Sequence, residues 1–132
     1  MSALPIPDEA TAISFPLPAP LMNMNKRLHW TVERSHARAW RTAALLAAID
    51  TLGTPKARRR PPSIVQVTLP VRTNARRDPH NYFPTVKHIV DGLVDAGVWP
   101  DDNPQWVTTV EPALRRGTNG LVIIVLTPRG DH

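Results

Sequence analysis

The chain has 132 residues, of which 42% are hydrophobic and 20% charged, a balance that suits one compact domain and excludes wholesale disorder. It contains no cysteine, which excludes disulfide frameworks, thiolate metal sites and cysteine nucleophiles. No apolar run approaches the roughly 18–20 residues that span a bilayer, and no secretory leader pattern opens the chain. We therefore expect a soluble protein of a reducing cytoplasm.

The sequence is basic, with 16 Lys and Arg against 11 Asp and Glu and a net charge of +5. A basic surface attracts phosphate polyanions, because binding releases the counterions that surround them. Many basic domains bind no nucleic acid, so the net charge alone leaves this function open. The positions of the charges are more informative, because several acids lie close together within residues 76–102.

The N-terminal half predicts one strand and one long helix. Residues 1–11 are rich in proline and small residues, and we expect a flexible arm there. Residues 12–17 predict an edge strand, because the proline within them cannot donate a ladder hydrogen bond, and residues 18–30 predict a loop. Residues 35–52 predict a helix, since they are rich in Ala, Leu and Arg and end before Gly53, a typical helix stop.

The C-terminal half predicts a strand, a helix and two further strands. Residues 63–71 alternate in the manner of a strand. Residues 81–96 form an amphipathic helical pattern with a proline in the first turn and a glycine directly after the last. Residues 105–110 and 120–126 predict two strands that pair as a hairpin across residues 115–119.

The order β-α-β-α-β-β indicates a small α/β (α+β) domain, a mixed β-sheet with two main helices packed on it. We expect this domain over residues 12–128, followed by a frayed end at residues 129–132. There are no internal repeats, so a single copy of the motif must form the whole core.

Three aspartates flank the second predicted helix, Asp78 before it and Asp101 and Asp102 after it. Because the helix doubles back across the sheet, their carboxylates can converge, and repelling carboxylates are expected to hold a hard cation. Oxygen ligands favour Mg²⁺, which can activate water and stabilise the charge that develops on a scissile phosphate. The alternative is that both acidic segments are ordinary solvated turns.

Other polar residues in the sequence have two interpretations each. Lys87 lies four residues before Asp91 on the predicted helix, so it either contacts a scissile phosphate or forms a surface ion pair worth a few tenths of a kcal/mol. His80 is a metal ligand, a phosphate contact or an exposed loop histidine. The basic segment 55–62 is either a solvated loop or a DNA contact, for which its charge is the only support. Its arginines are Arg58, Arg59 and Arg60.

Taken together, residues 76–102 resemble the RusA-type Holliday junction resolvases, small endodeoxyribonucleases associated with phages and prophages. The family pattern is an acidic turn RRD-x-D-N, a helix with a lysine and a D-x-L step, and a return AG-[VF]-W-x-DD. The surrounding strands and helices agree in order, though less specifically. The matching residues are Arg76-Arg77-Asp78-Pro79-His80-Asn81, Lys87 with Asp91-Gly92-Leu93, and Ala96-Gly97-Val98-Trp99-Pro100-Asp101-Asp102.

The resemblance implies a homodimer that binds four-way DNA junctions and makes paired, symmetric nicks with Mg²⁺, in DNA recombination and repair. Two-fold symmetry suits this task, because a junction presents two equivalent strands to two equivalent sites. It also implies a phage- or prophage-encoded protein in the cytoplasm of a bacterial host. Roles carried over by position are catalysis by Asp78, Lys87 and Asp102, metal binding by Asp78 and Asp102, DNA backbone contacts by Arg76 and Arg77, and support of the site by Asn81 and Asp91.

The sequence departs from the family pattern at two places. His80 stands where the pattern has a second carboxylate, and the stretch from Asn81 to Lys87 is longer than in the shorter family pattern. Imidazole is a poorer ligand for Mg²⁺ than carboxylate and is better tolerated by Mn²⁺, so His80 and Asp101 are secondary candidates as ligands and Mn²⁺ is a candidate substitute. Two alternatives stay open: a junction- or branched-DNA-binding protein with weakened catalysis, and a nuclease for flaps and forks.

Overall fold

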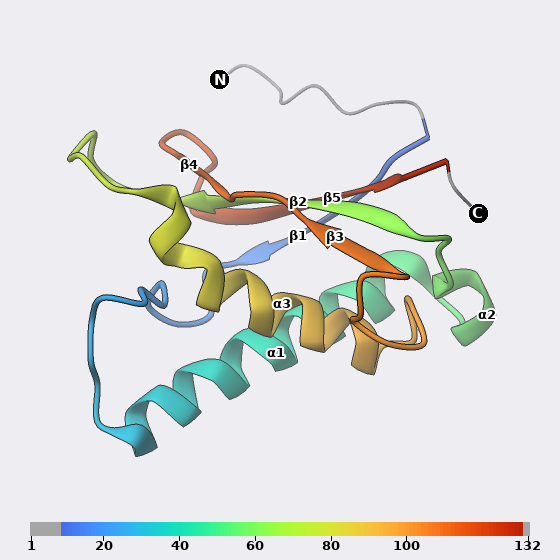
Figure 1. Ribbon diagram of the computed structural model, residues 1–132, viewed down its shortest axis with the longest axis horizontal. Coiled ribbons are helices and arrows are strands. Elements are labelled where there is room, and N and C mark those ends of the chain that lie inside the picture. Colours follow the sequence, from blue (N-terminus) through green and yellow to red (C-terminus); the bar gives the residue numbers. More distant parts are fainter. Residues whose placement is uncertain (1–8, 131–132) are drawn as a thin grey trace.

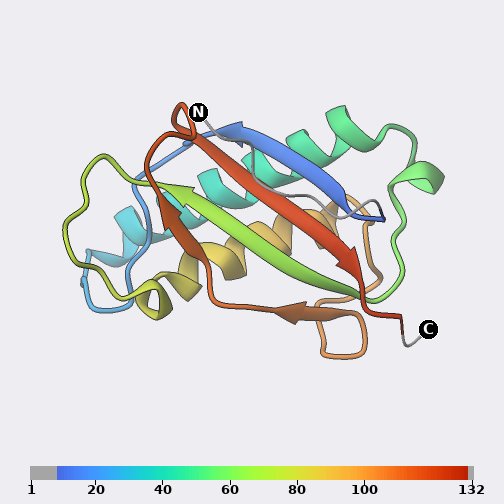
Figure 2. The ribbon, with the colours of Figure 1, turned by 90° about the horizontal axis from the view of Figure 1, so that it is seen from above.

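The fold is a five-stranded mixed sheet with two helices packed against it (Figure 1). The structure, a computed structural model, describes residues 9–130. Helices α1 (Trp30–Leu52) and α3 (Phe83–Asp95) lie side by side below the sheet in Figure 1, and Figure 2 shows both crossing the same face. The predicted α/β (α+β) class, with two main helices on a mixed sheet, is confirmed.

The long central strand β2 pairs on both sides. On one side it is antiparallel to β5, which is in turn antiparallel to β1. On the other side two short strands, β3 and β4, pair in parallel with the first and last parts of β2. The strands are β1 (Thr11–Pro16), β2 (Ser63–Pro70), β3 (Val107–Thr109), β4 (Ala113–Arg115) and β5 (Leu121–Pro128).

The predicted hairpin between residues 105–110 and 120–126 is wrong. Both strands exist, but β5 pairs with β1 and β2, while β3 lies on the opposite edge of β2. The intervening strand β4 was missed, because it has only three residues and follows the buried Pro112, which cannot donate to a ladder. The sheet is mixed because β3 and β4 pair with β2 in parallel, whereas β1, β5 and β2 pair antiparallel.

Helix α1 begins at Trp30, five residues before the predicted start at residue 35. The side chain of His29 caps it by accepting a hydrogen bond from the backbone N–H of Thr31. The first two turns are largely exposed, including Trp30 at 59%, so they carry no apolar stripe by which the pattern could have found them. The predicted stop is confirmed, since the Gly53 N–H bonds to the Ile49 carbonyl at the end of the helix.

Two short helices precede β2 and α3. Within the expected basic linker lies α2 (Pro55–Arg58), capped by Thr54. A 3₁₀ turn, η1 (Pro79–Tyr82), leads directly into α3, where Pro84 occupies the first turn as predicted. Helix α3 ends at Asp95, and the φ of 83° at Gly97 lets the Val98 N–H return to the Leu93 carbonyl.

The core lies between the helices and the sheet. Alternate residues of β2 and β5 are buried toward α1 and α3, as a period of two requires. Trp40 on α1 and Trp99 after α3 are fully enclosed, and each indole N–H donates to a backbone carbonyl, those of Pro20 and Pro61. Trp99 and Val98, which belong to the motif, are therefore part of the core.

The predicted arm and tail lie mostly outside the described residues, at residues 1–8 and 131–132. Within the described part, β1 begins at Thr11, and Arg129 of the expected frayed end donates hydrogen bonds to the Pro104 and Gln105 carbonyls. Across residues 9–130, no helix combines the length and the apolar character that crossing a membrane requires.

Candidate functional site

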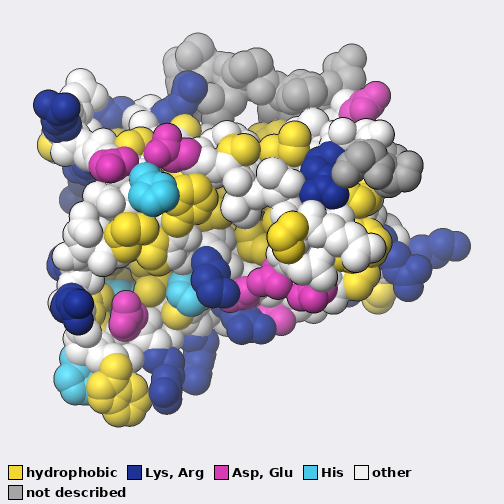
Figure 3. All heavy atoms as spheres, in the orientation of Figure 1, with side chains coloured by type: hydrophobic (Ala, Val, Ile, Leu, Met, Phe, Trp, Pro, Cys, Tyr) yellow, Lys and Arg dark blue, Asp and Glu magenta, His cyan; other side chains and the backbone are white. Residues whose placement is uncertain are grey.

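Two of the predicted catalytic residues, Lys87 and Asp102, line the same open groove between α3 and β3. Its volume is about 660 Å³. The groove lies on the face that Figure 3 shows. On this face, apolar side chains are bordered by basic, acidic and histidine side chains over α3 and the short strands. The apolar lining comes from the first two turns of α3, from the loop before α1 and from the segment that leads into β3. Its residues are Met24, Phe83, Pro84, Val86, Val90, Pro104 and Val107.

The periodicity of α3 positions Lys87. Val86, Ile89 and Leu93 are buried toward the sheet, which turns Lys87 outward with 66% of its side chain exposed. Its Nζ lies 3.7 Å from Oδ2 of Asp91, one turn further along the helix. An exposed pair of this kind contributes little to stability and leaves the ammonium group accessible from solvent.

Asp91 also faces His88, whose Nδ1 lies 3.7 Å from the same carboxylate oxygen. Burial lowers the pKa of His88 below its ordinary value, and this effect exceeds the opposing attraction of Asp91. Lys87 and Arg41 also lower the pKa, while Glu33 raises it. His88 lines the groove, and its lowered pKa favours the neutral imidazole there.

The neighbours Asp101 and Asp102 have different surroundings. Oδ1 of Asp101 accepts the Asp102 backbone N–H at 2.7 Å, and its Oδ2 accepts a hydrogen bond from the Asn103 side chain at 3.1 Å. These hydrogen bonds lower the pKa of Asp101. They also hold the turn after Trp99 in place. Asp102 instead lines the groove, so its position suits a contact with a bound ligand better than that of Asp101.

Asp78 and His80 lie at η1, next to the groove but outside its lining. Asp78 caps the 3₁₀ turn, because its Oδ1 accepts the His80 N–H at 3.0 Å. The His80 ring meets the ring of Phe83 edge-to-face, with 5.1 Å between centroids, and Phe83 is itself a wall of the groove. The Asn81 carbonyl accepts the Met24 N–H at 2.8 Å and so joins this turn to the loop between β1 and α1.

The candidate ligands fit Mg²⁺ in donor chemistry. Mg²⁺ is commonly held through one or two carboxylates, several waters and substrate phosphates. Within residues 9–130, no three His, Asp or Glu side chains are grouped closely enough to hold a metal ion by themselves. Asp102 with Asp78 would therefore need water and phosphate to complete the coordination. The assignments of Asp78, His80, Asp101 and Asp102 as ligands stay predictions.

The predicted DNA-contacting arginines form two separate groups at opposite ends of β2. Arg58 and Arg60 are engaged within the fold: Arg58 Nε donates to the Ala96 carbonyl at 2.7 Å, and Arg60 Nε donates to Thr11 Oγ1 at 3.0 Å. Arg59 between them is exposed. At the other end, Arg77 donates to the Thr73 and Ala75 carbonyls and so shapes its own loop, whereas Arg76 is exposed.

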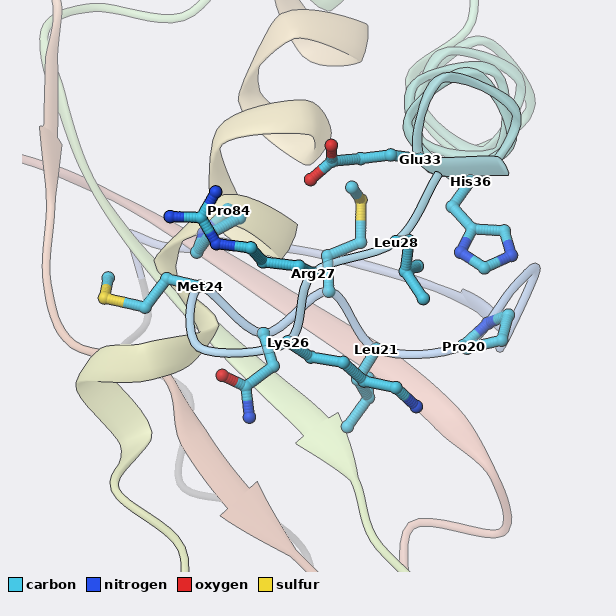
Figure 4. A pocket seen from close by; sticks show the side chains of 11 residues that line it. Pro20, Leu21, Met24, Lys26, Arg27, Leu28, Glu33, His36 and Pro84 are labelled. Atoms are coloured by element: carbon cyan, nitrogen blue, oxygen red, sulfur yellow. The ribbon is translucent and has the colours of Figure 1, made fainter. Parts of the chain in front are cut away.

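Sequence reasoning missed the contribution of residues 18–29 to the site. Met22 and Thr85 exchange hydrogen bonds, Met22 N–H to Thr85 Oγ1 at 2.8 Å and Thr85 Oγ1–H to the Met22 carbonyl at 3.0 Å, which holds this loop against α3. Met24 then borders the groove and also a second cavity of about 360 Å³ beside the start of α1. Figure 4 shows Arg27 in that cavity extending toward Pro84. No local sequence signal could have placed this loop, because its hydrogen-bond partners Asn81 and Thr85 lie 57 and 63 residues further along the chain.

A scan against protein-family models gives no match for this chain, and a search of curated proteins gives none either.

Proposed function

We propose that the protein is a Mg²⁺-dependent endonuclease that cuts branched DNA, with four-way junctions as its substrate, in the manner of the RusA-type resolvases that its sequence resembles. The observation that carries the proposal is the shared groove of Lys87 and Asp102. These residues come from different elements and match two separate parts of the family motif. A groove with a lysine, a carboxylate and an open mouth suits a phosphodiester strand.

Each residue has a distinct proposed task. The Lys87 ammonium group binds the scissile phosphate, where it offsets charge that grows as water attacks phosphorus and a P–O ester bond breaks. Asp102 and Asp78 would hold Mg²⁺, which when bound supplies electrostatic stabilisation and lowers the pKa of water. Asp91 orients Lys87 from one turn away on the same helix. Neutral His88 lines the groove without adding a second positive charge beside Lys87.

The proposal includes a homodimer, because paired nicks on a two-fold symmetric junction require two sites related by the same symmetry. It also includes the cytoplasm of a bacterial host as the location, where such DNA is found. Both are properties of the resolvases that the motif resembles.

The experiment compares junction cleavage and junction binding in matched variants. Lys87→Met and Asp78→Asn should each lower the Mg²⁺-dependent nicking rate roughly 10²-fold or more, because each removes a group that acts on the reacting phosphate. Junction affinity, measured in EDTA, should change little. The control is Asp50→Asn, an exposed acid on α1, which should nick like wild type. Normal nicking by both site variants would overturn the assigned roles.

A second candidate is a junction-binding protein without cleavage, favoured by the placement of His80. This residue replaces a carboxylate of the family pattern and packs its ring on Phe83. On this view, wild type binds junctions but nicks them with neither Mg²⁺ nor Mn²⁺, and His80→Asp restores nicking. Cleavage by wild type together with loss of cleavage in His80→Asp would exclude this candidate.

A further inference from the structure

Five arginines lie on the last residue of β4 and on the segments that follow β2 and β4, at one end of the sheet. Because these two strands are parallel, with Pro70 opposite Arg115, the segments that follow them leave the sheet at the same edge. The Val71 N–H donates to the Arg115 carbonyl at 3.0 Å and extends the pairing by one residue. We name this group the arginine edge, and its members are Arg72, Arg76, Arg77, Arg115 and Arg116.

The arginine edge is accessible and positively charged. Four of its side chains are exposed and Arg77 is half-buried. Within residues 9–130, no carboxylate forms an ion pair with any of the five. The nearby acids along the chain are Asp78, which caps η1, and Glu111 before β4. Five positive groups against two carboxylates leave an excess of +3 at this edge.

The edge also has a defined shape. A cavity of about 250 Å³ lies between the loop after β2 and the end of β4, and Thr73, Arg77, Leu114 and Arg116 are among its lining residues. Arg77 is fixed by its bonds to Thr73 and Ala75, which holds the loop in place. Planar guanidinium groups on such a frame match phosphate oxygens in pairs.

We propose that the arginine edge binds the phosphate backbone of a duplex DNA arm, with Arg72, Arg115 and Arg116 as contacts beyond those of the resolvase motif. This rests on the proposed function for the identity of the nucleic acid. The loop that carries Arg76 and Arg77 continues through Asp78 and η1 into α3, so a backbone along the edge approaches the groove of Lys87 and Asp102. The edge fixes the position of an uncut arm, and the groove receives the cut strand.

The test is DNA affinity against salt concentration for two matched double variants, measured in EDTA so that no cleavage occurs. Arg115→Gln/Arg116→Gln removes two charges from the edge. Arg34→Gln/Arg38→Gln removes two from exposed positions on α1, in the helical layer below the sheet, which has no assigned part in DNA binding. The probes are a synthetic four-way junction and a linear duplex.

The edge variant should bind both probes roughly tenfold or more weakly at about 0.1 M salt, and its slope of log affinity against log salt should be shallower by about 1–2. The α1 variant should stay within about twofold of wild type. Arg72→Gln alone should show about half of the slope change. An unchanged slope in the edge variant, or equal losses in both double variants, would overturn the arginine edge.

The outcome is separable from that of the nuclease proposal. If the edge variant loses affinity while wild type cuts no junction under any divalent ion, the nuclease proposal fails and the DNA-binding edge stands. If wild type cuts junctions and the edge variant binds and cuts equally well, the edge fails and the nuclease proposal stands.

Discussion

Asp101 and Asp102 show how two identical neighbours acquire different roles from their surroundings. The turn after Trp99 engages both carboxylate oxygens of Asp101 in hydrogen bonds, whereas Asp102 borders the groove. The resemblance assigns the role to Asp102 by position, but two adjacent aspartates in a sequence give no physical reason for that preference. The distinction depends on which side chain the turn uses for its own hydrogen bonds.

His88 predicts a pH dependence of stability at the scale of one residue. Its folded-state pKa lies below the ordinary value of 6.5, mainly because of burial, so the unfolded chain binds a proton more readily than the folded one. Stability should therefore be highest above pH 6.5 and fall as the pH drops toward the lower folded-state pKa. His88→Gln should remove this part of the decline, which chemical unfolding between pH 5 and 8 would measure. Parallel curves for wild type and variant would contradict the assignment.

At the scale of elements, Gly92 decides how closely α3 approaches α1. A Cβ at this position would lie 2.2 Å from the Arg41 carbonyl oxygen, which is backbone and cannot swing away. The bidentate pair of Arg41 with Asp95, with an Nη2–Oδ1 distance of 2.8 Å, joins the same two helices one turn further along α3. Gly92 of the family-like motif is thus explained by packing between helices.

Gly92→Ala should accordingly destabilise the protein, although alanine favours helix by about 1 kcal/mol over glycine. Separating the helices should cost about 1–3 kcal/mol net of this gain, by analogy with overpacked cores. Thermal or denaturant unfolding measures the change. A variant as stable as wild type, or more stable, would show that α1 and α3 are not in this close contact.

The elements with a buried stripe could be predicted, and those without one could not. Helix α3 and strand β2 follow their hydrophobic periods closely and were predicted almost to their ends. The exposed first turns of α1 and the three-residue β4 carry no such pattern. The pairing of β5 could not be predicted from local sequence, because two strands close in sequence favour a hairpin. In the structure, β5 pairs instead with β2 at the buried centre of the sheet.

The candidate site was predictable to a similar degree. The motif predicted Asp78, Lys87 and Asp102 as one site, and in the structure Lys87 and Asp102 line one groove while Asp78 lies outside its lining. The motif could not show that Arg58 and Arg60 form hydrogen bonds within the fold that hold the segment before β2. Nor could it show that Met24, from a loop distant in sequence, lines the groove. It also missed Arg72, Arg115 and Arg116, because their proximity depends on a parallel strand pair that no local pattern indicates.

At the scale of the whole molecule, the groove and the arginine edge are connected along the chain by η1. The groove lies between α3 and β3, and the arginine edge lies where β2 and β4 end, with η1 joining the two. In the proposed complex, DNA contacts both, one through a cut strand and the other through an uncut arm. Two copies related by two-fold symmetry would engage a junction in this way on opposite strands.

The most direct test of this account is Mg²⁺-dependent cleavage of a mobile four-way junction beside a linear duplex of the same sequence, with wild type and Asp102→Asn compared. We predict that wild type makes paired nicks in the junction and leaves the duplex intact, while Asp102→Asn binds the junction and nicks it roughly 10²-fold more slowly or not at all. Equal cutting by the two proteins, or cutting of the duplex as fast as of the junction, would contradict the account.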